Sequence, residues 1–331
     1  MNTFGRQLRV SIFGESHGEC VGITVDGCPA GLLLTTADFT NDLGRRGSGA
    51  PGTTPRKEPD LPVIKTGVFN DHTTGAPLTI EFNNTNTISR DYLKLRETPR
   101  PGHADFTAMK KYGGFEDYRG GGHFSGRLTL GLVAAGVIAK KLINPVNVTA
   151  TLLEAGGSAD IDAAIEEAVQ KRDSIGGIVG CTVTGVPVGL GEPFFDSVES
   201  LIGHIVFAIP AVKGLEFGSG FEGSRMRGSE NNDLFISTDG KTLTNNAGGI
   251  NGGITNGNDL VFRVAVKPTS STHQKQHTIN IATGQMTDLE IEGRHDTCIA
   301  LRVPPVVEAA TALVLADLMM LEGLIGRVVS R

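Results

Sequence analysis

The chain has 331 residues, 39% of them hydrophobic and 20% charged, with a formal net charge of −6. This composition is typical of a globular protein with a real core, and the negative charge argues against bulk binding to nucleic acid or an anionic membrane. No segment approaches the ~20 continuous apolar residues that span a bilayer, and the N-terminal stretch lacks the apolar core of a signal peptide. Four cysteines without CxxC spacing predict reduced thiols in a cytoplasmic enzyme.

In chain order, the apolar patterns predict a mixture of strands and helices. Strand character covers residues 8–13, 20–25, 61–68, 77–82, 146–153, 177–188 and 259–267. Helical periodicity covers residues 105–112, 128–143, 161–171, 198–208 and 304–321. The helices at 128–143 and 304–321 are apolar almost all round, which predicts that they are buried between layers. We therefore expect one α+β domain over residues 1–331, with helices packed between sheets.

The 45 glycines gather in three clusters, at 44–52, 113–126 and 248–257. Each cluster also contains Arg, Ser, Asn or His. Such loops suit a phosphate or flavin site, because backbone N–H groups without a neighbouring side chain can point at an anion. Surface loops that merely join strands are the alternative, and we expect it to hold for at least half of these glycines.

Three histidines stand in charged, glycine-containing turns. His17 lies in FGESHG, His103 lies in RPGHAD between Arg100 and Asp105, and GRHDTC places His295 beside Asp296. Together they supply general acids, a carboxylate and an anion-binding arginine, although each alone is equally consistent with a solvated loop. The sequence has no HExxH, no zinc-type Cys/His spacing, no Walker lysine loop and no GxSxG elbow. Metal-dependent hydrolysis, nucleotide hydrolysis and serine catalysis are therefore disfavoured.

Three long motifs in this order resemble the signatures of the chorismate synthase family. They are GESHGECVGITVDGCPAG at 14–31, GGGHFSGRLTLGLVAAGVIAKK at 120–141 and GRHDTCIALRVPPVVEAA at 293–310. The segments TTPRKEPD, TTGAPL, RPGHAD, NNAGGINGG and KPTSST fall between them in the family's order. The resemblance covers essentially the whole chain.

The resemblance implies a reaction, a cofactor and a fold. Members of the family convert 5-enolpyruvylshikimate 3-phosphate to chorismate by an anti 1,4-elimination of phosphate. They require reduced FMN although the reaction has no net redox change, so an external flavin reductant is expected, with NADPH as its source. The implied structure is a β-α-β sandwich with antiparallel sheets, assembled as a cytoplasmic homotetramer.

The resemblance also implies roles for individual residues. His103 resembles the general acid that protonates the leaving phosphate, His17 the histidine that protonates reduced flavin, and Asp296 the carboxylate that helps flavin N5 remove the C6 proton. A substrate with two carboxylates and a phosphate requires arginines; the candidates are Arg45, Arg46, Arg100, Arg127 and Arg294. The expected FMN contacts are His123, Phe124, Ser125, Asn246, Ala247, Gly252, Lys267, Pro268, Thr269, Ser270, Ser271 and again Arg294.

Two departures from the family pattern and two rival functions remain. Pro51 stands where many members have an arginine, for which Arg56 or Lys57 could compensate, and His123 replaces a residue that is often arginine. One rival is a flavin oxidoreductase with net hydride transfer, which would consume a reductant in proportion to product. The other is an anion-binding module for RNA phosphates through Arg45 and Arg46, which the net charge of −6 argues against.

Overall fold

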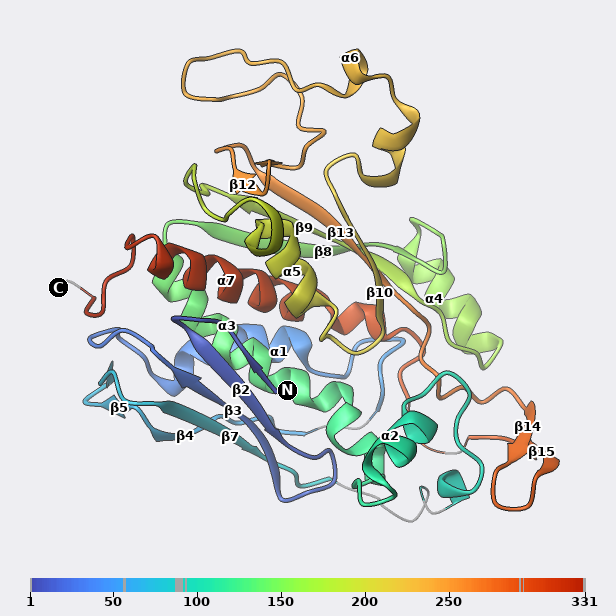
Figure 1. The fold of residues 1–331 in the computed structure, drawn as a ribbon. Helices are drawn as coiled ribbons and strands as arrows, with labels where there is room; N and C mark the ends of the chain where they lie inside the picture. Colours follow the sequence, from blue (N-terminus) through green and yellow to red (C-terminus); the bar gives the residue numbers. More distant parts are fainter. Residues whose placement is uncertain are drawn as a thin grey trace.

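Two antiparallel sheets enclose a layer of helices, as Figure 1 shows. The computed structural model describes residues 2–55, 58–86, 92, 94–291, 293 and 295–329. Helices α3 (Thr129–Ile143) and α7 (Pro304–Leu321) pack against each other in the middle layer, with one sheet on either side. This arrangement confirms the predicted α+β class and its β-α-β sandwich.

The first sheet comes from the N-terminal quarter of the chain and covers α3. In its strand β7 the side chains alternate, with Leu78, Ile80 and Phe82 fully buried, because successive residues of a strand point to opposite faces. The strands lie in the order β1 (Thr3–Phe4), β2 (Arg9–Gly14), β3 (Cys20–Asp26), β7 (Leu78–Asn83) and β4 (Val63–Thr66).

The second sheet covers α7 on the other side of the helical layer. Its strand β13 shows the same alternation, with Leu260, Phe262 and Val264 buried. The strands lie in the order β10 (Val212–Phe217), β13 (Leu260–Val266), β9 (Gly177–Thr184) and β8 (Asn147–Ala155). One hydrophobic core runs through both sheets and the helices between them.

Helices α3 and α7 approach each other closely at Gly136. A Cβ atom on this glycine would lie 2.2 Å from Cβ of Ala309, so a larger side chain would push the two helices apart. Among the described residues, α7 is the one helix long and apolar enough to cross a membrane, and 89% of that stretch is buried in the core.

Shorter elements surround this sandwich. The helices are α1 (Thr40–Arg46), α2 (Asp105–Tyr112), α4 (Ile161–Gln170) and α5 (Val198–Val206). The 3-10 helices are η1 (Thr36–Phe39), η3 (Lys94–Arg96), η4 (Arg119–Phe124), η5 (Gly126–Leu128), η6 (Phe194–Asp196) and η8 (Ile299–Arg302). Two small hairpins are β5 (Val68–Phe69) with β6 (His72–Thr73), and β14 (Gln276–Asn280) with β15 (Gln285–Leu289).

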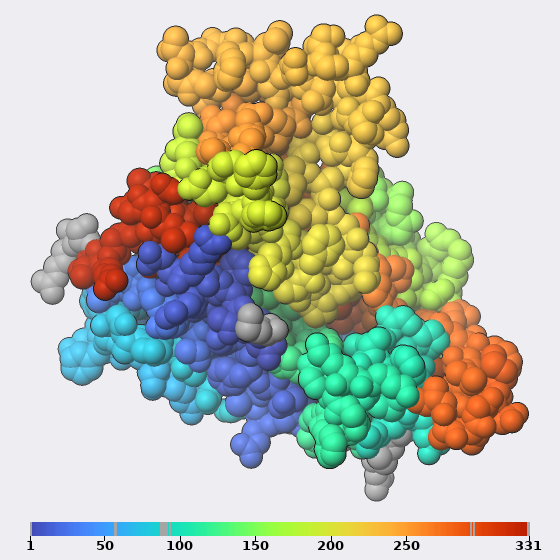
Figure 2. Space-filling model, viewed as in Figure 1, coloured from blue at the N-terminus to red at the C-terminus, as the bar shows by residue number. Residues whose placement is uncertain are grey.

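Residues 218–259, which we call the arm, extend from the sandwich, and Ile250 of this segment is buried in its core. The arm connects β10 to β13 and forms the yellow-to-orange lobe at the top of Figures 1 and 2. It contains η7 (Gly220–Arg225), α6 (Gly228–Asn231), β11 (Ile250–Asn251) and β12 (Ile254–Thr255).

The predicted elements differ from the structure at their ends and in several elements that were not predicted. The strand expected over 177–188 ends at Thr184, and the segment 61–68 divides into β4 and β5. Strand β10 was not predicted, and its pairing with β13 is broken by a register shift next to Gly214. The short polar helix α1 and the β14–β15 hairpin were not predicted either, because neither has a sustained apolar period.

Candidate active site

A cavity of about 580 Å³ lies beside the middle layer, near the start of α7. Its walls come from residues 207–213, from the segment 100–127 and from residues 295–306. In Figure 2 this face of the molecule is hollowed between the yellow and the teal segments, with orange-red residues at the bottom of the hollow. The volume falls within the range of about 300–1,000 Å³ that is usual for small-molecule sites.

Most of the predicted site residues meet in this cavity, although they come from distant parts of the chain. Those that line it are His103, Asp296, Arg46, Arg100, Arg127, His123, Phe124, Ser125, Lys267, Pro268, Thr269, Ser270 and Ser271.

A tightly bonded acid–base cluster lies at the start of α2. Asp105 accepts hydrogen bonds from Arg100 Nε and Nη2, both at 2.7 Å, and its Oδ1 is 2.6 Å from Nδ1 of His103. Burial alone would raise the pKa of Asp105, but the hydrogen bonds from Arg100 and His103 outweigh it and hold that pKa well below its usual range. The Asp105 carboxylate is therefore ionised at neutral pH, and it fixes both the ring and the guanidinium.

Arg46 is buried in another wall of the cavity. Its Nε donates to Thr129 Oγ1 at 2.9 Å and its Nη2 donates to the carbonyl of Gly126 at 3.0 Å. Its Nη1 has no hydrogen-bond partner among the described residues, and the nearest carboxylate oxygen, on Asp60, is 3.6 Å away. Burial, followed by the neighbouring charge of Arg302, lowers the pKa of Arg46 to about 9, so the side chain is still a cation at neutral pH.

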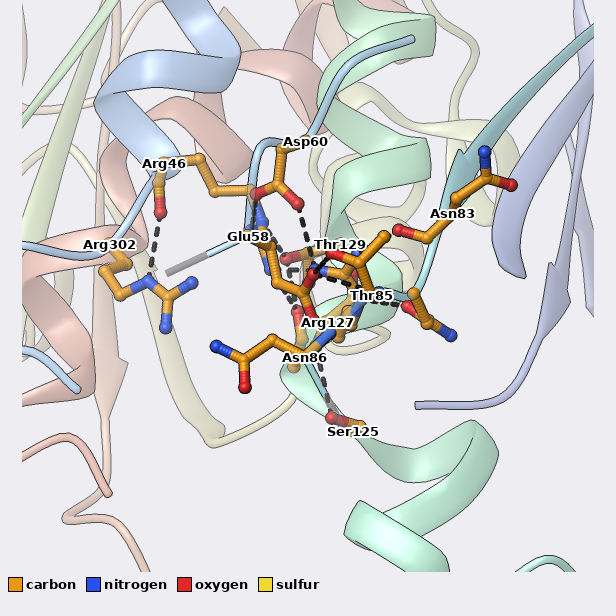
Figure 3. Close-up of polar contacts among 12 residues, drawn as sticks. Arg46, Glu58, Asp60, Asn83, Thr85, Asn86, Ser125, Arg127, Thr129 and Arg302 are labelled. Atoms are coloured by element: carbon orange, nitrogen blue, oxygen red, sulfur yellow. Dashed lines mark hydrogen bonds and ion pairs between the residues drawn. The ribbon is translucent and has the colours of Figure 1, made fainter. Parts of the chain in front are cut away.

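Asp60 joins Arg46 to a second buried arginine, as Figure 3 shows. Arg127 Nη1 donates to Asp60 Oδ1 at 2.9 Å, and its Nη2 donates to the carbonyl of Asn83 at the end of β7. Asp60 has a φ of +46°, a left-handed conformation that is uncommon outside glycine. The loop thus adopts a strained turn where its carboxylate reaches between two arginines.

Asp296 is held in place from two sides. The backbone N–H of Thr54 donates to Asp296 Oδ1 at 2.9 Å, and Arg302 Nη1 donates to both carboxylate oxygens at 3.3 and 3.2 Å. The aspartate side chain is only 12% exposed. Its carboxylate therefore has a fixed orientation in the cavity wall.

The KPTSS segment forms a polar rim near His103. Lys267 Nζ donates to Ser270 Oγ at 2.8 Å and to the carbonyl of Gly102 at 3.0 Å. Burial and the neighbouring charge of Lys213 lower the pKa of Lys267. The hydroxyl of Thr269 is buried and has no hydrogen-bond partner among the described residues. Such unpaired groups are rare in folded proteins and are expected where a ligand binds.

His17 lies directly behind a glycine of the cavity wall. Gly120, at the start of the GGG run, has a φ of +60°, and a Cβ atom there would lie 2.4 Å from Cδ2 of His17. The ring of His17 is buried and packs edge-on against Tyr92, which also lines the cavity. Glycine at 120 therefore leaves the space in which the histidine ring fits.

Arg45 does not line this cavity but joins a group that we call the interlayer cluster: Arg45, Asp42, Lys140 and Glu308. Arg45 makes a bidentate pair with Glu308, with N···O distances of 2.8 and 2.7 Å. Lys140 Nζ donates to Glu308 at 2.7 Å and to Asp42 at 2.6 Å. Burial opposes ionisation of Glu308, but hydrogen bonds from Arg45 and Lys140 outweigh it and hold the pKa of this glutamate below its usual range.

Three predicted FMN contacts lie on the arm instead of in the cavity wall. The backbone N–H groups of Asn246 and Ala247 donate to the carboxylate of Asp233, at 2.7 and 2.8 Å. Gly252 has a φ of +62° in the turn between β11 and β12. Arg294, predicted to contact both substrate and FMN, lies outside the described residues, as do Arg56 and Lys57.

Several cavity residues were missed by sequence reasoning. Thr54, Asp60, Lys213 and Arg302 all line the cavity. Arg302 lies inside the third motif, but it precedes an apolar helix and gave no separate signal. Asp60 lies in a loop whose path depends on its left-handed turn.

Comparison with known proteins places the chain in a family. The model of the chorismate synthase family matches residues 8–320. The chain belongs to the chorismate synthase family. A chorismate synthase from Chitinophaga pinensis is 66% identical over 323 residues, covering 97% of each chain, and one from Dehalococcoides mccartyi is 47% identical over the full length of both. A crystal structure of a chorismate synthase superposes with a TM-score of 0.73 at 25% identity and covers 98% of this chain and 95% of the other.

Proposed function

We propose that this protein converts 5-enolpyruvylshikimate 3-phosphate to chorismate and phosphate by anti 1,4-elimination, with reduced FMN bound beside the substrate. The observation that carries the proposal is the meeting of Arg46, Arg100 and Arg127 with His103 and Asp296 around one cavity. Membership of the chorismate synthase family supports the same reaction.

The charges of the cavity wall suit an anionic substrate. Arg46 presents a buried Nη1 donor that has no hydrogen-bond partner among the described residues. Arg100 supplies a second buried cation, and its Nη1 already donates to Ser271 Oγ at 3.0 Å. Because a phosphate or carboxylate offers several acceptor oxygens, we expect these guanidinium groups to bind the substrate's anionic groups.

His103 is placed to act as the general acid. Its Nδ1 is 2.6 Å from Oδ1 of Asp105 and 3.0 Å from Nη2 of Arg100, and we propose that this nitrogen donates to the carboxylate. The other ring nitrogen, Nε2, lies 3.5 Å from the position that a Cβ atom on Gly121 would occupy, and Gly121 lies in the glycine run that borders the cavity. When the ring is protonated, Nε2–H can give its proton to the phosphate oxygen as the C3–O bond breaks.

The residues present fit a bound FMN. The unpartnered hydroxyl of Thr269 and the donors of Lys267 and Ser270 suit its phosphate or ring edge, and the three left-handed glycines 120–122 leave backbone close to the cavity. When bound, reduced FMN supplies the electron-rich ring that the family requires. We propose that Phe124, Ser125 and the KPTSS residues hold it, with His123 kept in place by its contact of 2.8 Å with the carbonyl of Gly14.

His17 and Asp296 complete the proposed proton chemistry. His17, packed behind Gly120, would hold a proton on the flavin side of the cavity. Asp296, whose carboxylate is held in the cavity wall, would assist the removal of the proton that leaves C6 of the substrate. Elimination then releases one proton from C6 beside Asp296 and delivers another from His103 to the phosphate, so protons balance without net oxidation or reduction.

We also propose that the chain forms a homotetramer and acts in the cytoplasm with an external reductant for its flavin. The arm supports self-association, because it exposes the apolar side chains Phe221, Leu234, Phe235, Ile236 and Leu243. Through such a contact, Asn246 and Ala247 on the arm of one copy would reach an FMN bound in the cavity of another.

We treat residues 1–331 as one domain, supported by the shared core.

An anaerobic assay tests this proposal against its rivals. The purified protein is mixed with the enolpyruvyl phosphate ester and photoreduced FMN, oxidised FMN or no flavin, and phosphate and chorismate are measured. We expect equal amounts of phosphate and chorismate only in the sample with reduced FMN, without net oxidation of the flavin. Oxidation of flavin in proportion to product would favour the oxidoreductase, and absence of both products with reduced FMN would refute the assignment.

A further inference from the structure

Arg302 lies in the cavity wall, and neither the motifs nor the proposed reaction give it a role of its own. It is the last residue of η8, and α7 begins two residues later at Pro304. Its side chain is 19% exposed and lines the cavity. The residue thus lies between the buried start of α7 and the cavity.

The guanidinium of Arg302 contacts two residues that the proposed reaction uses. Its Nη1 donates to both carboxylate oxygens of Asp296, at 3.3 and 3.2 Å, and its Nε donates to the backbone carbonyl of Arg46 at 3.0 Å, as the dashed line in Figure 3 shows. Among the described residues, the other hydrogen bond to the Asp296 carboxylate comes from Thr54 N–H. Because a guanidinium is planar and rigid, one side chain holds Asp296 and Arg46 in a fixed relation.

This arrangement is not one that packing alone would favour. Arg302 and Arg46 are two cations in the same wall, and the charge of Arg302 contributes to the lowered pKa of Arg46. An apolar side chain of similar size would fill the space at 302 without bringing two like charges together. An arginine here therefore indicates a need for both its charge and its shape.

We propose that Arg302 is a positioning residue, which fixes the orientation of the Asp296 carboxylate toward the cavity while C6 of the substrate loses its proton. The inference rests on the proposed function, because Asp296 assists the loss of this proton only if the elimination takes place here. Arg302 itself forms and breaks no bond with the substrate. Its effect on the reaction passes through Asp296.

A double-mutant cycle tests this route. The kcat values of Arg302→Gln, Asp296→Asn and the double variant are compared with that of the wild type, under anaerobic conditions with reduced FMN. We expect Arg302→Gln to lower kcat by about ten- to a hundredfold in the wild type but by less than about threefold in Asp296→Asn. Arg302→Lys should recover only part of the loss, because a point charge cannot contact both partners. If the loss of kcat in the double variant equals the product of the two single-variant losses, the proposal is overturned.

Thermal unfolding without flavin gives a second reading of the same pair. Arg302→Gln should lower the Tm of the wild type by about 2 °C more than it lowers the Tm of Asp296→Asn, because only the wild type has a carboxylate that loses its partner. Arg9→Gln, which removes an exposed arginine paired with Asp26, is the matched control and should change neither kcat nor this difference. Equal Tm changes in both backgrounds would also overturn the proposal. An inactive wild type would overturn the proposed function itself. An active wild type, with independent losses of kcat in the two single variants, would overturn only the role of Arg302.

Discussion

Two neighbouring arginines belong to ionic groups with opposite properties. Arg45 lies in the interlayer cluster, where both oxygens of the buried Glu308 accept hydrogen bonds from cations. Arg46, the next residue, lies in the cavity wall with one donor that no described residue satisfies. A group whose buried carboxylate has both oxygens paired with cations serves to join layers of the fold. A group with an unpaired buried donor is suited to a ligand that supplies the missing acceptor.

The difference follows from the geometry of helix α1. Successive residues of an α-helix point in directions about 100° apart, so the two side chains of an Arg-Arg pair cannot face the same neighbour. Arg45 pairs with Glu308 on α7, whereas Arg46 donates to the carbonyls that precede α3. Function is therefore to be assigned to each arginine separately.

Removing the general acid from the cavity should have the largest effect. We expect His103→Ala to lower kcat by about two to four orders of magnitude, the usual range for a positioned general acid. Tm and FMN affinity should change little, because the residue lies in a turn and is 21% exposed. Steady-state kinetics with reduced FMN measure the loss. A variant with more than a tenth of the wild-type rate would show that another group protonates the phosphate.

Breaking the interlayer cluster should reduce stability instead of chemistry. Glu308→Gln leaves Arg45 and Lys140 facing a neutral amide, and we expect a loss of about 3 kcal/mol in the free energy of unfolding. Urea unfolding followed by circular dichroism measures this change. The KM of the protein that stays folded should remain within about twofold of the wild type. A large rise in KM without loss of stability would assign this cluster to the substrate.

The adjacent arginines offer a matched pair of variants. Methionine keeps much of the length of arginine but removes its charge. Arg46→Met should lower substrate affinity by about thirtyfold or more, because a charge-assisted pair with an anionic ligand is worth about 2–5 kcal/mol when buried. Arg45→Met should lower affinity less than threefold and reduce Tm. Isothermal titration with substrate compares the affinities of the two variants. A larger loss of affinity in Arg45→Met than in Arg46→Met would exchange their roles.

Acid should weaken the interlayer cluster by a smaller amount. Because the pKa of folded Glu308 lies below its usual range, its contribution to stability is complete above the unfolded value of about 4.3 and is lost as the pH falls through the lower folded value. We therefore expect the Tm of the wild type to fall more steeply than that of Glu308→Gln between about pH 4.5 and pH 3. If the Tm of both proteins falls equally with pH, the ionised Glu308 carboxylate contributes nothing extra to stability.

The main layers could be predicted from sequence because their signal is local. Residues 128–143 and 304–321 are apolar almost all round, which is typical of helices buried between layers. The strand β10 could not be predicted in this way, because Gly214 interrupts its pairing and its alternation. The short helix α1 is polar at most positions, so its existence depends on contacts with α3 and α7.

The site was predictable where a motif holds the reacting groups close together, as in RPGHAD. The site was not predictable where its contacts join residues that are far apart in the sequence. Asp60 reaches Arg127 across 67 positions of sequence, and Arg302 reaches the backbone of Arg46 across 256. Neither partner can be inferred from spacing, since each depends on how the layers meet. The places of Asn246 and Ala247 on the arm likewise required the structure.

The location of both ligands is the most direct test of the central claim, that the cavity is the reaction site. It can be measured by a crystal structure of the protein with oxidised FMN and the enolpyruvyl phosphate ester. We predict both molecules in the cavity, with the phosphate ester within hydrogen-bond distance of His103 and an anionic group on Nη1 of Arg46. Ligands bound beside Glu308 in the interlayer cluster, or only on the arm with the cavity free, would contradict the account.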